Sequence, residues 1–353
     1  MNVTSLVCIG IPENRSEHYL FLTGANYATL NQDLIHTKLL RVRDNLGVNM
    51  QPIWFGKYQL ESPIMNGAGT CKTVEDVRKL ATAPVAAIMI GSYTVNAQDG
   101  NPGDVWASPL NSLGMPNRGI EYLRKEGREM RKIAHDAGKY LAVSVAGYTP
   151  DEYCQLSEVA FEIGADWTEL NKGCPNVWVT GGRQKEIVSF DEEVQDVIFD
   201  VMERAVGGQM YGPKYSPYTN PAQRIRVAQK VRSRRSVSFV TGINTFPNCY
   251  LPKEDGNPSI GFGKGLGGYS GPGMKAPALG QLVQFKEVFD EDPDCKIQYV
   301  YAGGVCTGRD VLDATRCGAT LVQVVTAYAE NHDPRVFERI ATEYVNLVDP
   351  VHA

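Results

Sequence analysis

Residues 297–328, IQYVYAGGVCTGRDVLDATRCGATLVQVVTAY, decide the fold that the sequence predicts. The stretch begins with an apolar run rich in β-branched and aromatic residues, which is typical of a buried strand. That run ends in the pair Gly303-Gly304, and the segment T-G-R-D after it opens a stretch of helical periodicity over 308–317. A second apolar run follows over 321–328. The stretch is therefore predicted to form one strand–helix–strand unit of a parallel sheet.

The same unit recurs along the chain from about residue 60. Apolar runs predict strands at 64–69, 85–92, 140–147, 167–173, 210–216, 237–245, 297–305 and 321–328. Helical periodicity predicts helices near 74–81, 121–138, 151–165, 190–206, 221–234, 278–290, 308–317 and 334–347. Eight such units predict an α/β fold, a (β/α)₈ TIM barrel over 51–353 with residues 1–50 as an N-terminal extension. An open doubly wound sheet is the alternative, because a strand count alone does not close a barrel.

Composition narrows the class of protein. The chain has 353 residues, of which 43% are hydrophobic and 21% charged, so it can bury a sizeable core. A net charge of −5 argues against a nucleic-acid partner. No apolar run reaches the roughly 18–20 residues of a membrane span, and the first residues lack the pattern of a secretory signal. The eight cysteines show no metal-binding spacing. We expect a cytoplasmic protein with reduced thiols and no metal site.

Two residues near predicted strand ends carry reactive groups. Cys174 lies in the loop segment ELNKGCPN (169–176), where a thiol of tuned pKa is able to serve as a base or nucleophile. The alternative is a buried structural cysteine. Only His332 falls in a loop on the same predicted face, so a Cys–His protease arrangement is weakly supported. Lys214 lies within an apolar strand, where it needs an anion or an electron-rich ligand unless it is solvated at an edge.

Amides and glycines complete the predicted mouth of the barrel. Four asparagines there make a neutral pocket that suits a planar heterocycle with alternating N–H and C=O groups: Asn111, Asn171, Asn176 and Asn244. The Gly303-Gly304 pair and the turn after the eighth strand form the usual phosphate site of such barrels. Three long loops follow strands two, four and six, over 93–120, 174–189 and 246–277. We expect the glycine-rich loop over 246–277 to act as a lid or to contact a ligand, with a surface insertion as the alternative.

Together these segments resemble the dihydroorotate dehydrogenase family, most closely its class 1 members. The resemblance runs from about Phe55 to Val348. Its motifs, in chain order, are NGAG (66–69), NSLGMPN (111–117), SVAG (144–147), ELNKGCPN (169–176), INT (243–245), GGYSG (267–271) and AGGV (302–305). It implies one FMN per chain, a small-molecule substrate and a homodimer. No dinucleotide-binding G-x-G-x-x-G follows the first strand and no cysteine cluster suits an iron–sulfur centre, which favours a small electron acceptor or oxygen.

The resemblance also implies a role for each matching residue. Cys174 is the base that takes a proton from the reduced ring while the adjacent C–H delivers hydride to flavin N5, and Lys214 faces the flavin N1/O2 edge. The implied substrate residues are Asn111, Gly114, Met115, Asn171, Asn176, Asn244 and Thr245. The implied cofactor residues are Ala68, Gly69, Ser92, Asn171, Lys214, Ile243, Gly271, Gly303, Gly304, Val325 and Thr326. The implied reaction is the oxidation of dihydroorotate to orotate.

The chain departs from the family pattern in ways that bear on the substrate. The family usually has a lysine in the second strand, where this chain has Gly91, and Lys72 is a candidate to reach the same space. Lys172-Gly173 stands where the family commonly has Leu-Ser. One alternative is therefore the same chemistry on a neutral, pyrimidine-like ring or a specialised metabolite. Alternatives of other classes are a phosphate-binding barrel lyase or isomerase without flavin, and a catalytically silent binding protein.

Overall fold

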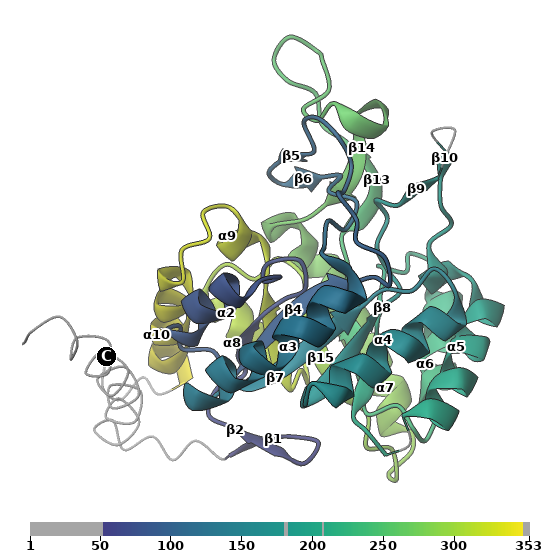
Figure 1. Ribbon diagram of the computed structural model, residues 1–353, viewed down its shortest axis with the longest axis vertical. Coiled ribbons are helices and arrows are strands. Elements are labelled where there is room, and N and C mark those ends of the chain that lie inside the picture. The colour runs from purple at the N-terminus through teal and green to yellow at the C-terminus, as the bar shows by residue number, and fades with distance from the viewer. Residues whose placement is uncertain (1–51, 180–182, 207, 349–353) are drawn as a thin grey trace, which may run out of the picture.

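Eight parallel strands close into a barrel in the computed structural model, which describes residues 52–179, 183–206 and 208–348 (Figure 1). The expected extension over 1–50 lies outside these residues. The order around the barrel is β3-β4-β7-β8-β11-β12-β15-β16, and β16 pairs with β3 to close it. The barrel strands are β3 (Ile64–Asn66), β4 (Ala87–Tyr93), β7 (Tyr140–Val145), β8 (Trp167–Asn171), β11 (Tyr211–Tyr215), β12 (Phe239–Gly242), β15 (Gln298–Ala302) and β16 (Leu321–Val324).

Helices surround the barrel and begin where the sequence supplies caps. Thr73 and Thr307 each form a capping box, and the Asn220 side chain accepts from the backbone N–H groups of the first turn of its helix. The helices are α2 (Val74–Ala81), α3 (Gly119–Asp136), α4 (Pro150–Glu162), α5 (Glu192–Ala205), α6 (Pro221–Arg232), α7 (Lys275–Asp290), α8 (Gly308–Arg316), α9 (Thr326–Ala329) and α10 (Arg335–Val348). Short 3₁₀ turns are η1 (Val188–Phe190), η2 (Phe262–Gly265) and η3 (Pro272–Met274).

A hairpin closes the barrel at the amino ends of its strands. It consists of β1 (Ile53–Phe55) and β2 (Tyr58–Leu60), and it lies at the bottom of the view in Figure 1. Its Phe55 is fully buried against Trp167 and Phe239, with ring centroids 5.1 and 5.2 Å away. This contact seals the floor with aromatic rings, so the open end of the barrel is the opposite one.

A four-stranded antiparallel sheet stands over that open end (Figure 1). Two of the long loops form it together, since β14 pairs with β6 at Gly268 opposite Asn111. Its strands are β5 (Trp106–Ala107), β6 (Leu110–Asn111), β13 (Phe246–Tyr250) and β14 (Leu266–Tyr269). The third long loop carries a separate hairpin, β9 (Trp178–Val179) and β10 (Arg183–Gln184). We refer to the four-stranded unit as the mouth sheet.

The predicted barrel is confirmed, and the open doubly wound sheet is wrong because β16 hydrogen-bonds to β3. All eight barrel strands end at other residues than the sequence predicted, and the eighth and sixth show why. The eighth strand ends at Val324 rather than 328, because Tyr328 and Ala329 donate to the Val325 carbonyl and so form α9. The sixth ends at Gly242 rather than 245, since beyond it Asn244 donates to the Tyr215 carbonyl outside the regular ladder.

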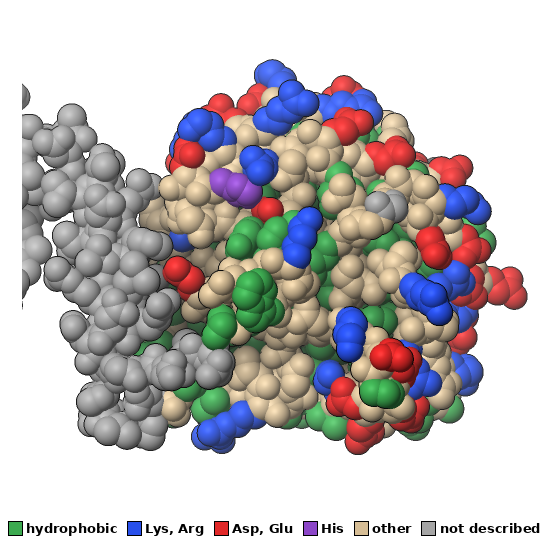
Figure 2. All heavy atoms as spheres, turned by 90° about the horizontal axis from the view of Figure 1, so that it is seen from below, with side chains coloured by type: hydrophobic (Ala, Val, Ile, Leu, Met, Phe, Trp, Pro, Cys, Tyr) green, Lys and Arg blue, Asp and Glu red, His purple; other side chains and the backbone are tan. Residues whose placement is uncertain are grey.

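The face around the hairpin carries charged side chains of both signs. Viewed from that end, acidic and basic groups alternate around the rim, and hydrophobic groups gather nearer the centre (Figure 2). No uniformly basic surface is present on the visible part of this face. Among the residues that the structure describes, no helix has the length and apolarity to cross a bilayer.

One lysine, directly after β8, is buried between the barrel and α5. Lys172 is 1% exposed, and its ammonium lies 3.8 Å from the ring centroid of Phe199 and 5.2 Å from that of Tyr215. Its Nζ has no hydrogen-bond partner among the described residues. Burial holds the pKa of Lys172 well below its ordinary range, because the charged amine loses its water. The folded protein is therefore expected to hold this amine neutral against aromatic rings.

Replacing Lys172 with Leu should stabilise the protein by about 1–3 kcal/mol, since a buried amine without a partner is removed. The unfolded chain binds this proton more readily than the folded one, so wild-type stability rises with pH towards the ordinary lysine pKa. That rise should shrink in Lys172→Leu, as measured by urea unfolding across alkaline pH. Lys125→Met, at a side chain that is 80% exposed, is the control and should change little. A less stable Lys172→Leu variant would contradict this account.

Candidate functional site

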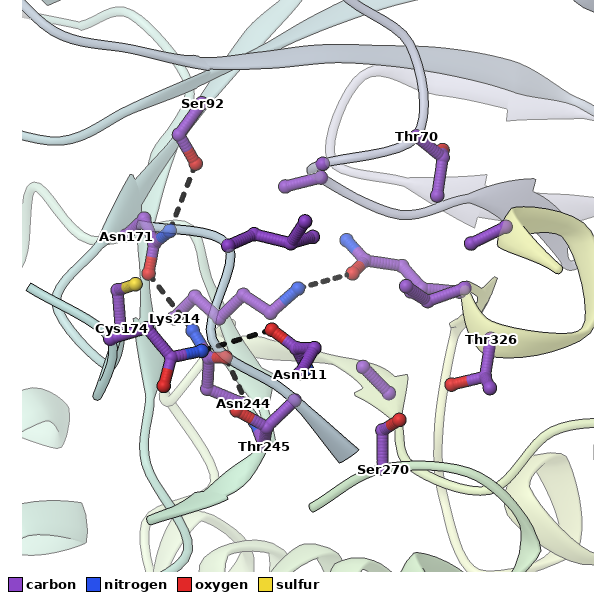
Figure 3. Close-up of a pocket in the computed structure, with 18 of the residues that line it drawn as sticks. Thr70, Ser92, Asn111, Asn171, Cys174, Lys214, Asn244, Thr245, Ser270 and Thr326 are labelled. Carbon is purple, nitrogen blue, oxygen red and sulfur yellow. Dashed lines mark hydrogen bonds between the residues drawn. The ribbon is translucent and has the colours of Figure 1, made fainter. Parts of the chain in front are cut away.

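A single pocket at the open end of the barrel brings the sequence-predicted site residues together. It lies beneath the mouth sheet, and Figure 3 shows Cys174, Asn171 and Asn244 on one side and Thr326 on the other. His332 does not line it. The predicted residues that line it are Ala68, Gly69, Lys72, Ser92, Asn111, Gly114, Met115, Asn171, Cys174, Asn176, Lys214, Ile243, Asn244, Thr245, Gly271, Gly303, Gly304, Val325 and Thr326.

A buried carboxylate from β8 lies under the pocket floor. Glu169 is fully buried, and its Oε1 lies 3.7 Å from Lys214 Nζ. Gln323 joins the two: Lys214 Nζ donates to Gln323 Oε1 at 2.9 Å, and Gln323 Nε2 donates to Glu169 Oε2 at 2.7 Å. Lys214 is only 5% exposed, so its charge is offset inside the protein while its amine still lines the pocket.

A chain of side chains links this carboxylate to the pocket amides. The Ser144 hydroxyl donates to Glu169 Oε1 at 3.3 Å and lies 2.9 Å from the Ser92 hydroxyl. Ser92 accepts from Asn171 Nδ2 at 2.9 Å, and Asn171 Oδ1 accepts from Asn244 Nδ2 at 3.0 Å (Figure 3). Since Glu169 only accepts, it fixes the direction of donation along the chain. The amides of Asn171 and Asn244 are therefore presented in one orientation.

The mouth sheet supplies the other pair of amides. Asn111 lies on β6 and donates to the Gly268 carbonyl of β14 at 3.2 Å. Its Oδ1 accepts from Asn176 Nδ2 at 2.9 Å, which ties the loop after β8 to the sheet. The side-chain Nδ2 of Asn101 also donates to the backbone carbonyl of Asn176 at 3.0 Å. All four predicted asparagines thus form two hydrogen-bonded pairs around the pocket.

Cys174 is positioned by a close approach of its loop to the barrel. A Cβ on Gly173 would lie 2.8 Å from the backbone nitrogen of Ser216, so a glycine lets this loop pack against the segment after β11. Burial raises the pKa of the Cys174 thiol above its ordinary value, while the backbone N–H of Asn176 and the charge of Lys72 lower it. Burial therefore favours the neutral thiol, whereas the neighbouring Lys72 favours the thiolate.

The far end of the pocket has the features of an anion site. Gly303 and Gly304 adopt φ values of 150° and 73° after β15, and neither of their backbone N–H groups, nor that of Val325, takes part in a hydrogen bond among the described residues. A Cβ on Gly69, at φ 97°, would meet no atom within 4 Å and would project into open space. These amides and this space fit the phosphate and the body of a flavin mononucleotide.

The second-strand position that carries a lysine in the family pattern has no room for one here. Gly91 has a φ of 97°, and a Cβ on it would lie 2.4 Å from the Ser144 carbonyl oxygen. Lys72 instead reaches the pocket from the loop between β3 and α2 and donates from Nζ to the Pro116 carbonyl at 2.6 Å. Lys72 thus lines the pocket, and its replacement of the family lysine stays a prediction.

Sequence reasoning missed the residues that support the site. Glu169, Gln323 and Ser144 received no role, although each is a polar residue within an apolar barrel strand. Glu169 lies two residues before Asn171 on β8, and this period of two places both side chains inside the barrel. The sequence signal that could have identified Glu169 was Lys214, because a buried lysine needs a negative charge nearby.

Comparison with known proteins places the chain in a family. The family model described as dihydroorotate dehydrogenase matches residues 53–347. The chain belongs to the dihydroorotate dehydrogenase family. The family is flavin-dependent, and membership confirms the prediction of an oxidoreductase that acts on a CH–CH group.

Individual relatives agree with this assignment. The chain is 27% identical to the dihydroorotate dehydrogenase A (fumarate) of Lactococcus lactis over 305 residues, which cover 84% of this chain and 93% of the relative. It is 28% identical to the dihydroorotate dehydrogenase (fumarate) of Saccharomyces cerevisiae over 298 residues, covering 82% and 90%. The crystal structure of the Eimeria tenella enzyme in complex with ferulenol has the same fold, with a TM-score of 0.67, 15% identity and 92% of each chain covered.

Glu169 and Lys214 should behave as a coupled buried pair. Glu169→Gln and Lys214→Met should each destabilise the flavin-free protein by about 3–5 kcal/mol, because each leaves the other group buried without its counter-charge. The double variant should lose much less stability than the sum of the losses in the two single variants. Urea unfolding measures this coupling. The partly exposed pair Lys230–Asp196 is the matched control and should couple by at most about 1 kcal/mol. Additive losses at Glu169 and Lys214 would contradict the pairing.

Proposed function

We propose that this protein is an FMN-dependent oxidoreductase that oxidises dihydroorotate to orotate. The single observation that carries the proposal is the convergence in one pocket of Cys174, Lys214, four asparagines and the unpaired backbone amides after β15 and β16. The relatives named dihydroorotate dehydrogenase (fumarate) support both the substrate and the reaction. The direction of the reaction that we propose is oxidation of the ring.

The geometry supports a division of the pocket between cofactor and substrate. Gly303, Gly304 and Val325 offer backbone N–H groups to a phosphate, and Lys214 extends from the floor between the two sides of the pocket (Figure 3). Asn171 and Asn244 lie beside Cys174, where a ring bound to them would face the thiol. When bound, FMN accepts the hydride that the ring gives up.

The chain's own residues supply the acid–base chemistry. Cys174, as thiolate, takes the proton from the ring carbon next to a carbonyl, and the new C=C bond forms as hydride leaves the adjacent carbon. The four asparagines hold the ring amides, and Glu169 fixes the direction of donation for the Asn171–Asn244 pair. Lys214 places positive charge where negative charge develops. The mouth sheet excludes water above the ring.

A second candidate is the same chemistry on a neutral pyrimidine-like ring. The observation that favours it is Gly91, where the second strand has no lysine and no room for one. For the assembly we propose a cytoplasmic homodimer, as the resemblance to class 1 implies, and it uses a small electron acceptor. The acceptor in the names of the relatives is fumarate.

Anaerobic reduction of the protein's flavin tests the proposal. Acid treatment should release FMN, identified by chromatography, and dihydroorotate should bleach the bound flavin. A panel of neutral dihydropyrimidines serves as the comparison, because faster bleaching by one of these would favour the second candidate. A colourless protein that takes up no FMN, or one that releases FAD, would contradict the cofactor assignment.

Replacing Cys174 with Ala should leave flavin binding intact and slow flavin reduction by about 10²–10⁴, the scale for a lost general base. In the wild type the rate should rise with pH beyond the ordinary cysteine range, because burial raises the pKa of the thiol and the thiolate is the active form. Stopped-flow absorbance across pH measures both effects. Cys174→Ser should outperform Cys174→Ala at high pH. A wild-type rate in Cys174→Ala would make the residue structural.

A further inference from the structure

Lys72 projects a cation into the pocket without a carboxylate partner. Its amine donates to the Pro116 carbonyl at 2.6 Å, which leaves two N–H groups free to bind another acceptor. None of the ion pairs within the described residues includes Lys72. Its backbone is held in place, since the Lys72 and Thr73 N–H groups both donate to Asp76 Oδ2 at 3.0 Å. Asp76 therefore holds in place the loop from which the Lys72 amine reaches the pocket.

The rest of the pocket does not neutralise this charge. No Asp or Glu lines the pocket among the described residues. The only other lysine that lines it, Lys214, already has Glu169 at 3.7 Å beneath the floor. Among the described residues that line the pocket, Lys72 is therefore the lysine without an ion pair; burial lowers its pKa, while the nearby Cys174 and Asp76 raise it. An anionic group of a ligand placed beside this amine would favour its charged form.

The amine lies at the substrate end rather than the phosphate end. The amine donates to the carbonyl of Pro116, which lies in the loop after β6. Asn111 is the last residue of β6. Lys72 is also close enough to Cys174 for its charge to lower the pKa of that thiol. The unpaired amides of Gly303 and Gly304 lie after a different strand, β15. The Lys72 amine thus faces the ring and its base.

We propose that Lys72 binds the carboxylate of a monoanionic ring substrate and so determines specificity in this protein. This rests on the proposed function for the ring itself. The cation comes from the loop after β3 because the second strand has no space for a side chain, with a Gly91 Cβ at 2.4 Å from the Ser144 carbonyl oxygen. The preferred substrate is then a ring that carries a carboxylate on the edge facing Lys72, rather than the same ring without a carboxylate.

Calorimetric titration of the oxidised holoprotein with orotate and with uracil, the same ring without the carboxylate, tests this role. Wild type should bind orotate more tightly than uracil. Lys72→Met should weaken orotate binding about ten- to a hundredfold, the scale for one charge-assisted hydrogen bond. Uracil binding should stay within about twofold. Lys72→Arg should retain most of the affinity for orotate, and Lys125→Met is the surface control.

The outcomes separate this inference from the proposed function. Unchanged orotate binding in Lys72→Met, or an equal loss of orotate and uracil binding, would overturn the role of Lys72. Flavin that dihydroorotate does not reduce, together with orotate binding that depends on Lys72, would overturn the proposed function and leave the carboxylate site standing. Flavin content and melting temperature check that each variant is folded. If Lys72→Met fails to fold, Lys72→Gln, which keeps N–H donors without the charge, replaces it and should lose orotate affinity selectively.

Discussion

The buried carboxylate of Glu169 is the constraint on which the catalytic end of the barrel depends. A carboxylate inside a protein is costly unless each oxygen accepts hydrogen bonds and a cation lies nearby. Here Gln323, Ser144 and Lys214 meet that requirement from three other strands. Through Ser144 and Ser92 the same charge sets the orientation of Asn171. This one carboxylate thereby positions both Lys214 and the amide of Asn171.

The site is built partly from barrel strands and partly from the mouth sheet. The barrel strands carry Lys214 and Asn171, and the strand ends carry the glycines of the anion site. Asn111 instead belongs to the mouth sheet, whose short strands come from two insertions. The half of the pocket proposed for the cofactor thus rests on the barrel, whereas part of the half proposed for the substrate rests on a small sheet above it. Adaptation to a different ring is easiest in that sheet and in the loop that carries Lys72, since neither contributes to barrel closure.

The sequence predicted the barrel well because its signals are local. Thr73 and Asn220 predict where helices begin, and apolar runs between helices predict strands that are buried on both faces. The mouth sheet was predicted only as loops, because its strands of two to five residues join segments 157 residues apart, as Asn111 and Gly268 show. Glu169 was visible as a carboxylate in an apolar strand, but its partner Gln323 is 154 residues away. The motif residues meet in one pocket, whereas their roles remain predictions.

The hairpin at the barrel floor has a consequence for synthesis on the ribosome. The Gly56 N–H donates to Gln298 Oε1 at 2.6 Å, and Gln298 Nε2 donates to the Trp54 carbonyl at 2.7 Å, so this docking joins residues 242 positions apart. At roughly 5–20 residues per second, the docking partner of the hairpin emerges about 12–48 seconds after the hairpin itself. Phe55 lacks its partners Trp167 and Phe239 until these residues emerge, and the edge of β3 lacks β16 for longer than that interval. The nascent chain therefore exposes an aromatic surface and an unpaired strand edge, and both are features that chaperones bind.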